Sequence, residues 1–288
     1  MWKIFPKKVL FQLNSLKMRK ILVHLMLLLL IIPSFVQAVN TNYQYSDYRN
    51  LIGKEKNVQQ KLKTKNPLIG ITSHHLPTAS PLLDNFYYQL QIARPNIETF
   101  VVVGPDHFER CKQKFVASDA KIATMFGELE IDHTLLGQIL KTGPKIENDC
   151  FVGEHSIGVE ANYIKKFFPK AKIAPILLSY SAKARNFDKL IKVLQKNKDN
   201  IFVLESTDFT HYTDVEKANA NDEISRKLIK DLNGEAFSLK QVDSPATIKL
   251  ILQLARTLKL SAEIIEHKNS HDYTGSYNNT TSYFSVIF

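Results

Sequence analysis

Two residue types that often build functional sites are scarce in this sequence of 288 residues. There are only two cysteines, Cys111 and Cys150, and neither belongs to a motif with the ligand spacing of a zinc site. Gly70 and Gly104 are isolated glycines, so neither belongs to a phosphate-binding loop. Ser206 lacks the Gly-x-Ser-x-Gly surroundings of a hydrolase nucleophile. The sequence therefore argues against a cysteine zinc motif, a phosphate-binding loop and a serine hydrolase.

Excess positive charge is scarce outside the first 38 residues. The formal net charge is +10, and residues 1–38 contribute +6 of it because they contain six basic residues and no acid. The remaining +4 is small for a chain of this size, and no later basic block is interleaved with aromatic residues. The sequence therefore predicts no nucleic-acid partner.

A continuous hydrophobic run occurs near the N-terminus, where basic residues precede an apolar stretch over residues 21–32. The tripeptide Val36-Gln37-Ala38 then offers a small-residue cleavage site, so we expect a signal peptide over residues 1–38. The run is shorter than the roughly 20 residues that span a bilayer, although an uncleaved anchor is the alternative. We expect a periplasmic or extracellular protein that meets the membrane only through this signal. In an exported protein the two cysteines either pair or remain isolated buried thiols.

The remaining sequence alternates between strand-like and helical patterns. Residues 39–66 are polar and lysine-rich, which predicts a linker, and residues 67–288 have the apolar content of one domain. Expected strands and helices alternate along this domain, with an antiparallel insertion around Gly127: strands near 68–72, 99–103, 172–178, 201–204, 262–267 and 282–288, and helices near 80–94, 134–141, 154–168, 187–196, 219–232 and 246–258. This order predicts a three-layer α/β fold, with a mostly parallel central sheet and helices on both faces. The first strand-helix-strand unit predicts parallel pairing through a right-handed crossover.

Three of the expected strands end in a polar segment that contains a histidine. The histidines in these segments are His74, His107 and His211. A fourth histidine, His155, lies at the start of an expected helix. Because ligands collect at the carboxyl ends of parallel strands, we expect one shared site for these side chains. Imidazole binds metals and also titrates near neutral pH, so the group predicts metal binding, acid–base chemistry or both.

Two acidic residues adjoin these histidines. Glu154 either orients a neighbouring imidazole or complements the dipole of the helix that follows it. Asp208 either pairs with His211 or serves as a turn residue.

The ordered motifs TSHHL, VVVGPDHF, TMFGELEID, GEHSIGVE, ESTDFTHY and NSHDYTGSYNNTTSYFSVIF resemble the Memo family, whose prokaryotic members are named AmmeMemoRadiSam system protein B. The resemblance runs from Leu68 to the C-terminus. It implies a fold similar to that of class III extradiol dioxygenases, with a metal at the carboxyl edge of the sheet. It also implies iron or copper bound by two histidines and a cysteine, with a further histidine close by.

Carried onto this sequence, the resemblance makes His74 and His107 metal ligands and His211 the nearby histidine. It places His155 and Glu154 in the lining of the site. Where the family has its cysteine, this chain reads KQVDSPATIKLIL, and Asp243 takes the best-matching position. A carboxylate in place of a thiolate favours Fe(II), with Cu and Zn as alternatives. Asp243 or Ser244 as the cap of the following helix is the other interpretation.

The leading hypothesis is an exported metal-binding protein of the Memo type, with non-haem Fe(II) and redox or dioxygenase-like chemistry on a small-molecule substrate. In this hypothesis His211 or His155 moves protons, and Asp208 and Glu154 assist them. A non-catalytic binding or accessory protein on the same fold is the first alternative. A zinc-dependent hydrolase with the same ligands is the second, because bound Zn²⁺ acidifies water.

Overall fold

The computed structural model describes residues 39–40, 46–54, 62–182 and 187–288, so the expected signal peptide lies outside the described residues. These described residues form one compact unit. Among the described residues, no helix combines the length and the apolar character needed to cross a bilayer.

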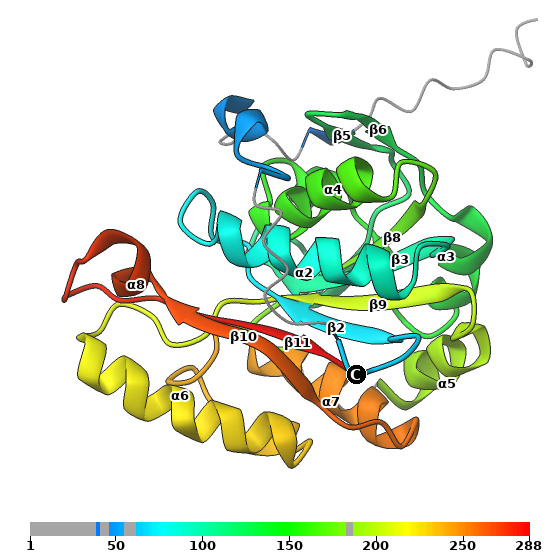
Figure 1. Cartoon of the computed structure of the whole chain (residues 1–288). Helices are drawn as coiled ribbons and strands as arrows, with labels where there is room; N and C mark the ends of the chain where they lie inside the picture. The colour runs from blue at the N-terminus through cyan, green and yellow to red at the C-terminus, as the bar shows by residue number, and fades with distance from the viewer. Residues whose placement is uncertain (1–38, 41–45, 55–61, 183–186) are drawn as a thin grey trace, which may run out of the picture. The chain divides into compact units, whose positions relative to one another are not determined.

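An eight-stranded sheet forms the centre of this unit, in the order β10-β11-β2-β9-β3-β8-β4-β7 (Figure 1). Its four central strands are parallel: β2 (Ile69–Thr72), β9 (Ile201–Ser206), β3 (Thr99–Pro105) and β8 (Lys172–Leu178). The flanking strands include antiparallel pairs, formed by β10 (Glu263–Asn269) with β11 (Ser282–Ile287), β11 with β2, and β4 (Phe115–Ala117) with β8, whereas β7 (Lys145–Ile146) runs parallel to β4. The expectation that the first two strands pair directly is wrong, because β9 lies between β2 and β3.

Helices cover both faces of the sheet, which confirms the three-layer α/β architecture. On one face lie α2 (Ser80–Ala93) and α4 (His155–Phe167), and on the other α5 (Phe187–Asn197) and α7 (Pro245–Thr257). The remaining helices are shorter or peripheral: α3 (His133–Leu140), α6 (Val215–Lys230), α8 (Ser270–Thr274), η1 (Ser46–Asn50), η2 (Asn148–Phe151) and η4 (Gly234–Ala236). A second, small sheet has the order β1 (Val39–Asn40), β5 (Ile122–Thr124) and β6 (Gly127–Leu129); β5 and β6 are the expected antiparallel insertion.

Two helices differ from the expected boundaries. Helix α6 begins at Val215, four residues before the expected start, because the side chain of Asp214 accepts the backbone N–H of Lys217 and caps the helix there. Helix α8 was not expected, and the capping box of Asn269 and Asp272 explains why so short a helix forms.

Part of the expected linker packs against the domain. Ile52 is buried in the core that α2 and α4 share, and the backbone N–H of Gly53 donates to Oδ1 of Asp84 at 2.6 Å. The few apolar residues of this polar segment, including the adjacent Leu51 and Ile52, show no sustained period, so the burial of Ile52 was not predictable from pattern. The packed part of the chain therefore begins before residue 67.

The twofold alternation of β9 distributes side chains between the two helical layers. Phe202 and Leu204 lie in the core shared with α2 and α4, whereas Val203 lies in the core shared with α5 and α7. The same alternation turns Ser206 toward the α4 side and Glu205 toward α7, where Thr247 donates to Glu205 at 2.7 Å. Two buried polar groups thus lie below the end of this strand, one on each face.

Candidate metal centre

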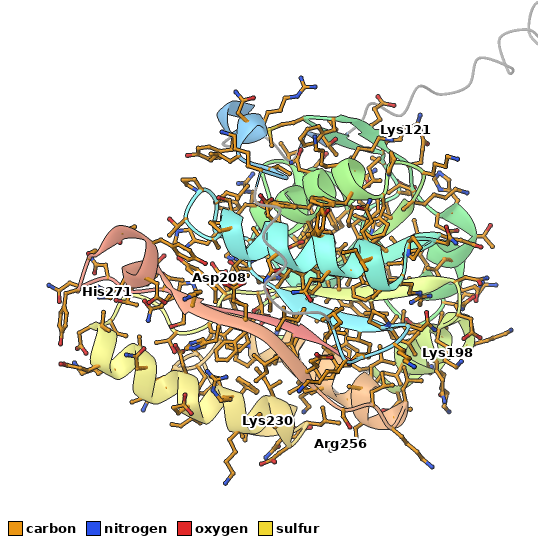
Figure 2. All side chains as sticks on the ribbon, in the orientation of Figure 1. Lys121, Lys198, Asp208, Lys230, Arg256 and His271 are labelled. Carbon is orange, nitrogen blue, oxygen red and sulfur yellow. A yellow bond between two sulfur atoms is a disulfide. The ribbon has the colours of Figure 1, made fainter. Side chains whose placement is uncertain are left out.

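Adjacent parallel strands bring the predicted histidines to one edge of the sheet. His74 follows β2, His107 follows β3, and both Asp208 and His211 follow β9, which lies between those strands. The rings of His74 and His107 meet edge to face with centroids 4.8 Å apart. Figure 2 shows Asp208 within the body of the unit. The strand order therefore builds one site from segments far apart in the sequence.

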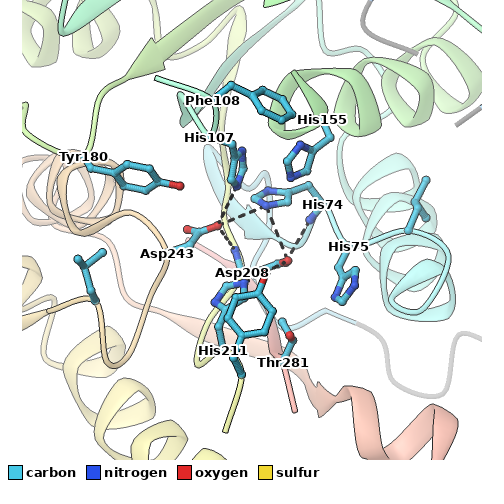
Figure 3. A pocket seen from close by; sticks show the side chains of 13 residues that line it. His74, His75, His107, Phe108, His155, Tyr180, Asp208, His211, Asp243 and Thr281 are labelled. Carbon is cyan, nitrogen blue, oxygen red and sulfur yellow. Dashed lines mark hydrogen bonds and ion pairs between the residues drawn. The ribbon is translucent and has the colours of Figure 1, made fainter. Parts of the chain in front are cut away.

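A pocket of about 660 Å³ opens at this edge (Figure 3). Most of the predicted site residues line it: His74, His107, His155, Asp208, His211 and Asp243. Glu154 does not line the pocket but lies fully buried beside His107. The volume is in the range of pockets that bind small organic molecules.

Glu154 fixes the orientation of His107. One carboxylate oxygen lies 2.8 Å from His107 Nδ1, and the other accepts the backbone N–H of His107 at 3.0 Å. The other ring nitrogen, Nε2, lies 3.6 Å from Oδ2 of Asp243. Burial lowers the pKa of His107, but its hydrogen bonds to Asp243 and Glu154 outweigh burial and raise the pKa to about 10. Both ring nitrogens of His107 therefore face carboxylates, which without a metal favours the charged form of the ring.

His74 presents the same nitrogen to the same carboxylate. Its Nδ1 lies 3.1 Å from Oγ of Ser206, and its Nε2 lies 3.3 Å from Oδ2 of Asp243. The ring is buried, so its orientation is set by these partners. The Nε2 atoms of His74 and His107 thus converge on one oxygen atom.

Asp243 is not the cap of α7. Ser244 fills that position, because its side chain accepts the backbone N–H of Thr247 at 3.4 Å. The carboxylate of Asp243 instead accepts hydrogen bonds from the hydroxyl of Thr207 and from the backbone N–H of Asp208, the latter at 3.1 Å. Burial raises the pKa of Asp243, but hydrogen bonds from the two histidines lower it well below its usual range. Asp243 is therefore an ionised group held toward the imidazoles.

Asp208 connects His74 to His211. Its Oδ1 accepts hydrogen bonds from the hydroxyl of Ser73 and from the backbone N–H of His74, the latter at 3.3 Å. Its Oδ2 lies 3.7 Å from His74 Nε2 and 3.9 Å from His211 Nε2. Burial opposes ionisation of Asp208, but the neighbouring histidines lower its pKa. His211 is 24% exposed, so it faces both Asp208 and the contents of the pocket.

His155 lies against the other two imidazoles. Its ring stacks on that of His107 at a centroid distance of 3.9 Å, and burial lowers the pKa of His155 to about 3. One nitrogen from each of His74, His107 and His155 lies within 4.8 Å of the others, a grouping that can hold a metal ion. The site therefore contains two candidates for a third donor, His155 and Asp243.

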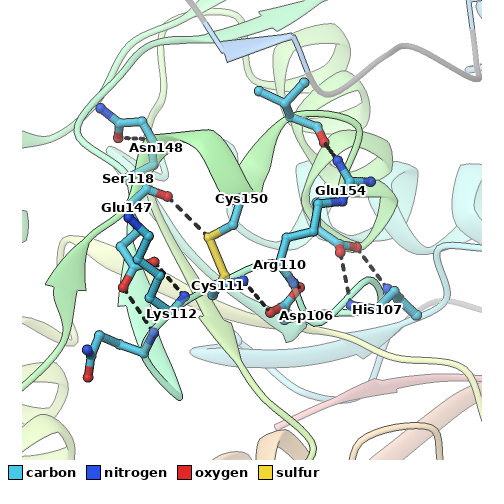
Figure 4. The surroundings of a disulfide bond; sticks show 12 residues. Asp106, His107, Arg110, Cys111, Lys112, Ser118, Glu147, Asn148, Cys150 and Glu154 are labelled. Carbon is cyan, nitrogen blue, oxygen red and sulfur yellow. Dashed lines mark hydrogen bonds and ion pairs between the residues drawn. A yellow bond between two sulfur atoms is a disulfide. The ribbon is translucent and has the colours of Figure 1, made fainter.

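The two cysteines form a disulfide beside this site (Figure 4). Cys111 follows the loop that carries His107, and Cys150 precedes the segment that carries Glu154. Asp106 reinforces the loop, because its buried carboxylate accepts the backbone N–H of Cys111 at 3.0 Å. Of the two alternatives for the cysteines, pairing is the one that the structure has.

Several residues of the pocket were not predicted as site residues. His75, Tyr180 and Thr281 line it, as do the exposed side chains of Tyr212 and Leu239. Adjacent histidines in the TSHHL motif were the only available signal for His75. Thr281 precedes β11, and only the pairing of β11 beside β2 brings this part of the chain to the site.

Comparison with known proteins gives consistent matches over this region. The sequence profile described as "Memo-like protein" matches residues 49–287. The chain is 28% identical over 251 residues to a MEMO1 family protein of Sulfurisphaera tokodaii, covering 82% of this chain and 88% of that protein. It is 29% identical over 203 residues to a MEMO1 family protein of Aquifex aeolicus, covering 66% and 75%. The crystal structure of an uncharacterized protein from Escherichia coli K12 aligns with a TM-score of 0.47 and 15% identity, covering 75% of this chain and 98% of that one.

Proposed function

The chain belongs to the family of Memo-like proteins, and we propose that it is an exported protein that binds Fe(II) through His74, His107 and Asp243. One observation carries the proposal: Nε2 of His74 and Nε2 of His107 lie 3.3 and 3.6 Å from the same oxygen of Asp243. Each Nδ1 atom already has a partner, Ser206 for His74 and Glu154 for His107. Such partners orient ligating imidazoles so that the free nitrogen faces a metal.

The donor set fits Fe(II). Two imidazoles and one carboxylate leave coordination positions open, and this combination suits non-haem iron, whereas a thiolate favours softer metals such as Cu(I). Asp243 needs no rearrangement to act as a donor, because Thr207 and the backbone of Asp208 already hold its carboxylate in place. When bound, the metal would supply a Lewis-acidic and redox-active centre for the small-molecule substrate.

The remaining polar residues would serve proton movement and orientation. His211 lies beside the ionised Asp208 and faces the pocket, where its imidazole would exchange a proton with a bound ligand. Glu154 would hold His107 in the tautomer that ligates through Nε2. His155, stacked on His107, would shield that ligand from solvent on the α4 side.

Export is supported by two independent features. The N-terminal sequence has the order of a signal peptide. The Cys111–Cys150 disulfide is a type of cross-link that persists in oxidising compartments. We therefore propose a periplasmic or extracellular location.

The metal is tested by elemental analysis of the exported protein, purified both with and without oxygen after expression with supplied iron. We expect about one iron per chain in the anaerobic preparation, no iron in Asp243→Ala, and near-normal iron in His155→Ala. His133→Ala is the matched control, because His133 is an exposed histidine on α3. An Asp243→Ala protein that binds iron as tightly as the wild type would disprove the ligand set.

A zinc-dependent hydrolase is the second candidate, and the grouping of His74, His107 and His155 favours it. Three histidines are a known ligand set for catalytic zinc, whose bound water becomes a nucleophile near neutral pH. Stoichiometric zinc that is lost in His155→Ala and retained in Asp243→Ala would support this candidate. Protein without bound metal under all these conditions would leave the binding or accessory role.

A further inference from the structure

His75 has a different environment from the histidine before it. It is half-buried and lines the same pocket, but its Nδ1 lies 2.7 Å from the hydroxyl of Tyr283. Tyr283 is on β11, is fully buried and does not line the pocket. The Nδ1 edge of His75 is therefore turned toward the protein interior.

The hydrogen-bond pattern around Tyr283 determines which nitrogen of His75 carries the proton. Ser270 accepts the backbone N–H of Thr281 at 3.0 Å, so its side chain is held beside Tyr283, where it slightly lowers the pKa of the phenol. Burial raises the pKa of Tyr283, so its phenol keeps its proton. That proton is the one available for Nδ1 of His75. A neutral imidazole that accepts at Nδ1 carries its own proton on Nε2.

This Nε2–H group has no acceptor within residues 62–182 and 187–288: no hydrogen bond or ion pair of the described chain involves it. The carboxylates across the pocket, Asp208 and Asp243, already accept hydrogen bonds from hydroxyl and backbone groups of this chain. The donor of His75 is therefore free for the contents of the pocket.

In contrast to these polar groups, part of the lining of the pocket consists of exposed, mostly apolar side chains. Phe108, Tyr212 and Leu239 line it, with exposed fractions of 40%, 81% and 69%. Tyr212 has a φ of +53°, a backbone conformation that bulky residues rarely adopt and that often marks functional segments. Exposed apolar side chains gathered around a polar floor indicate a ligand with an apolar body and a polar head.

We propose that His75 is a specificity-determining residue that donates a hydrogen bond from Nε2 to the carboxylate of a ligand whose apolar body lies against Phe108, Tyr212 and Leu239. A carboxylate is the head group that gains most from this arrangement, because hydrogen bonds to an ionised acceptor are about twice as strong as neutral ones. The inference rests on the proposed function only in assigning both the metal and the carboxylate to one pocket.

The tautomer is tested without any metal. Nitrogen NMR of the metal-free full chain with ¹⁵N-labelled histidine should show the proton of His75 on Nε2. Tyr283→Phe should remove the hydrogen bond and shift the Nδ1 resonance, while Tyr277→Phe, at an exposed tyrosine, should leave it unchanged. A His75 that carries its proton on Nδ1 would overturn the proposal.

Recognition is tested by calorimetry with benzoate on the cobalt(II)-loaded full chain, and on the metal-free chain if cobalt does not bind. We expect His75→Ala to weaken benzoate binding at least tenfold without changing cobalt content. His75→Gln, which retains a donor near the position of Nε2, should restore most of the affinity, and His133→Ala should match the wild type. Acetate, without the apolar body, and benzamide, without the charge, should both bind more weakly than benzoate.

The two proposals fail separately. Absence of cobalt and iron binding in the wild type would overturn the metal site but not the tautomer or the role of His75. Benzoate affinity that is unchanged in His75→Ala, or absent in the wild type, would overturn the inference whatever the metal content. If His75→Ala does not fold, His75→Gln and Tyr283→Phe provide the same comparison, with Tyr283→Phe expected to weaken benzoate binding severalfold.

Discussion

At the scale of single residues, the partner of a buried carboxyl decides its charge. Asp208, Asp243 and Glu154 face imidazoles, and their pKa values are lowered in spite of burial. Glu160 and Glu205 are equally buried but hydrogen-bond to hydroxyl groups of neighbouring side chains. Burial raises the pKa of both, because a hydroxyl compensates for lost hydration less well than a cation does. The site therefore has ionised carboxylates beside its imidazoles and neutral carboxyls beneath them.

Glu160 should make stability depend on pH. Burial raises its pKa from 4.5 to about 8, so the folded chain binds this proton more tightly than the unfolded chain. The free energy of unfolding should therefore fall as the pH rises from about 4.5 to about 8, by on the order of 4 kcal/mol. Glu160→Gln should remove this decline, as measured by urea unfolding of metal-free protein across that range. Glu128→Gln, at an exposed position, is the control, and an unchanged decline in Glu160→Gln would contradict the assignment.

His211 should affect reactivity more than metal affinity. Its Nε2 faces Asp208 at 3.9 Å, whereas the Nε2 atoms of His74 and His107 converge on Asp243. We expect His211→Ala to retain iron near the wild-type content and to change the rate of iron oxidation in air severalfold. Elemental analysis and absorption spectroscopy give the two quantities. Complete loss of iron in this variant would make His211 a ligand instead.

At the scale of elements, the start of α4 is held closely against the end of β3. A Cβ atom added to Gly104 would lie 2.6 Å from Oγ and 2.7 Å from Cβ of Ser156. The hydroxyl of Ser156 also donates to the carbonyl of Pro105 at 2.9 Å. This close contact positions Glu154 against His107, so a small residue on one strand supports the orientation of an imidazole on the following loop.

Gly104→Ala should therefore disturb both stability and metal binding. Overpacking of this kind costs about 1–3 kcal/mol, and displacement of α4 would loosen Glu154. Gly137→Ala is the matched control, since Gly137 lies in α3 with no atom within 4 Å of an added Cβ. That substitution should stabilise the protein by about 0.5–1 kcal/mol. Urea unfolding and iron titration measure the two effects, and a Gly104→Ala protein with wild-type iron affinity would refute the coupling.

At the scale of the whole molecule, the disulfide joins the loop after β3 to the segment before α4. The cross-link closes a loop of 39 residues, which by chain entropy stabilises the fold by about 3–4 kcal/mol. The double variant Cys111→Ser/Cys150→Ser should lose about 2–4 kcal/mol of stability and bind iron more weakly, because both His107 and Glu154 adjoin the cross-linked segments. Unfolding and metal titration of the two proteins provide the comparison. Equal iron affinity would show that the disulfide acts on stability alone.

The proposed export concerns the whole chain and can be measured directly. Cleavage after Ala38 should give a secreted protein whose N-terminal sequence begins at Val39. Mass spectrometry of the exported protein determines this end. A mature chain that retains any of residues 1–38 would contradict the cleavage site.

The sequence by itself determined the three layers of the fold and the edge of the sheet at which the site lies. Apolar periodicity is a local property, so alternating strands and helices predicted three layers, and polar segments after three strands predicted a shared edge. Parallel strands bring their carboxyl ends together in any order, which is why His74, His107 and His211 could be grouped from the sequence. The family resemblance, now confirmed, brought Asp243 to the same site.

Only the tertiary structure decided the strand order and the direction of each polar side chain. In the sheet, β9 lies between β2 and β3, and β11 pairs with β2. This order depends on contacts between segments that are distant in the sequence, and local periodicity does not report such contacts. Those contacts place Tyr283 behind His75 and turn the carboxylate of Asp243 toward the histidines rather than into the cap of α7. Hydrogen bonds of buried side chains form only when the whole sheet is assembled, and for that reason the chemistry of the pocket is a property of the fold.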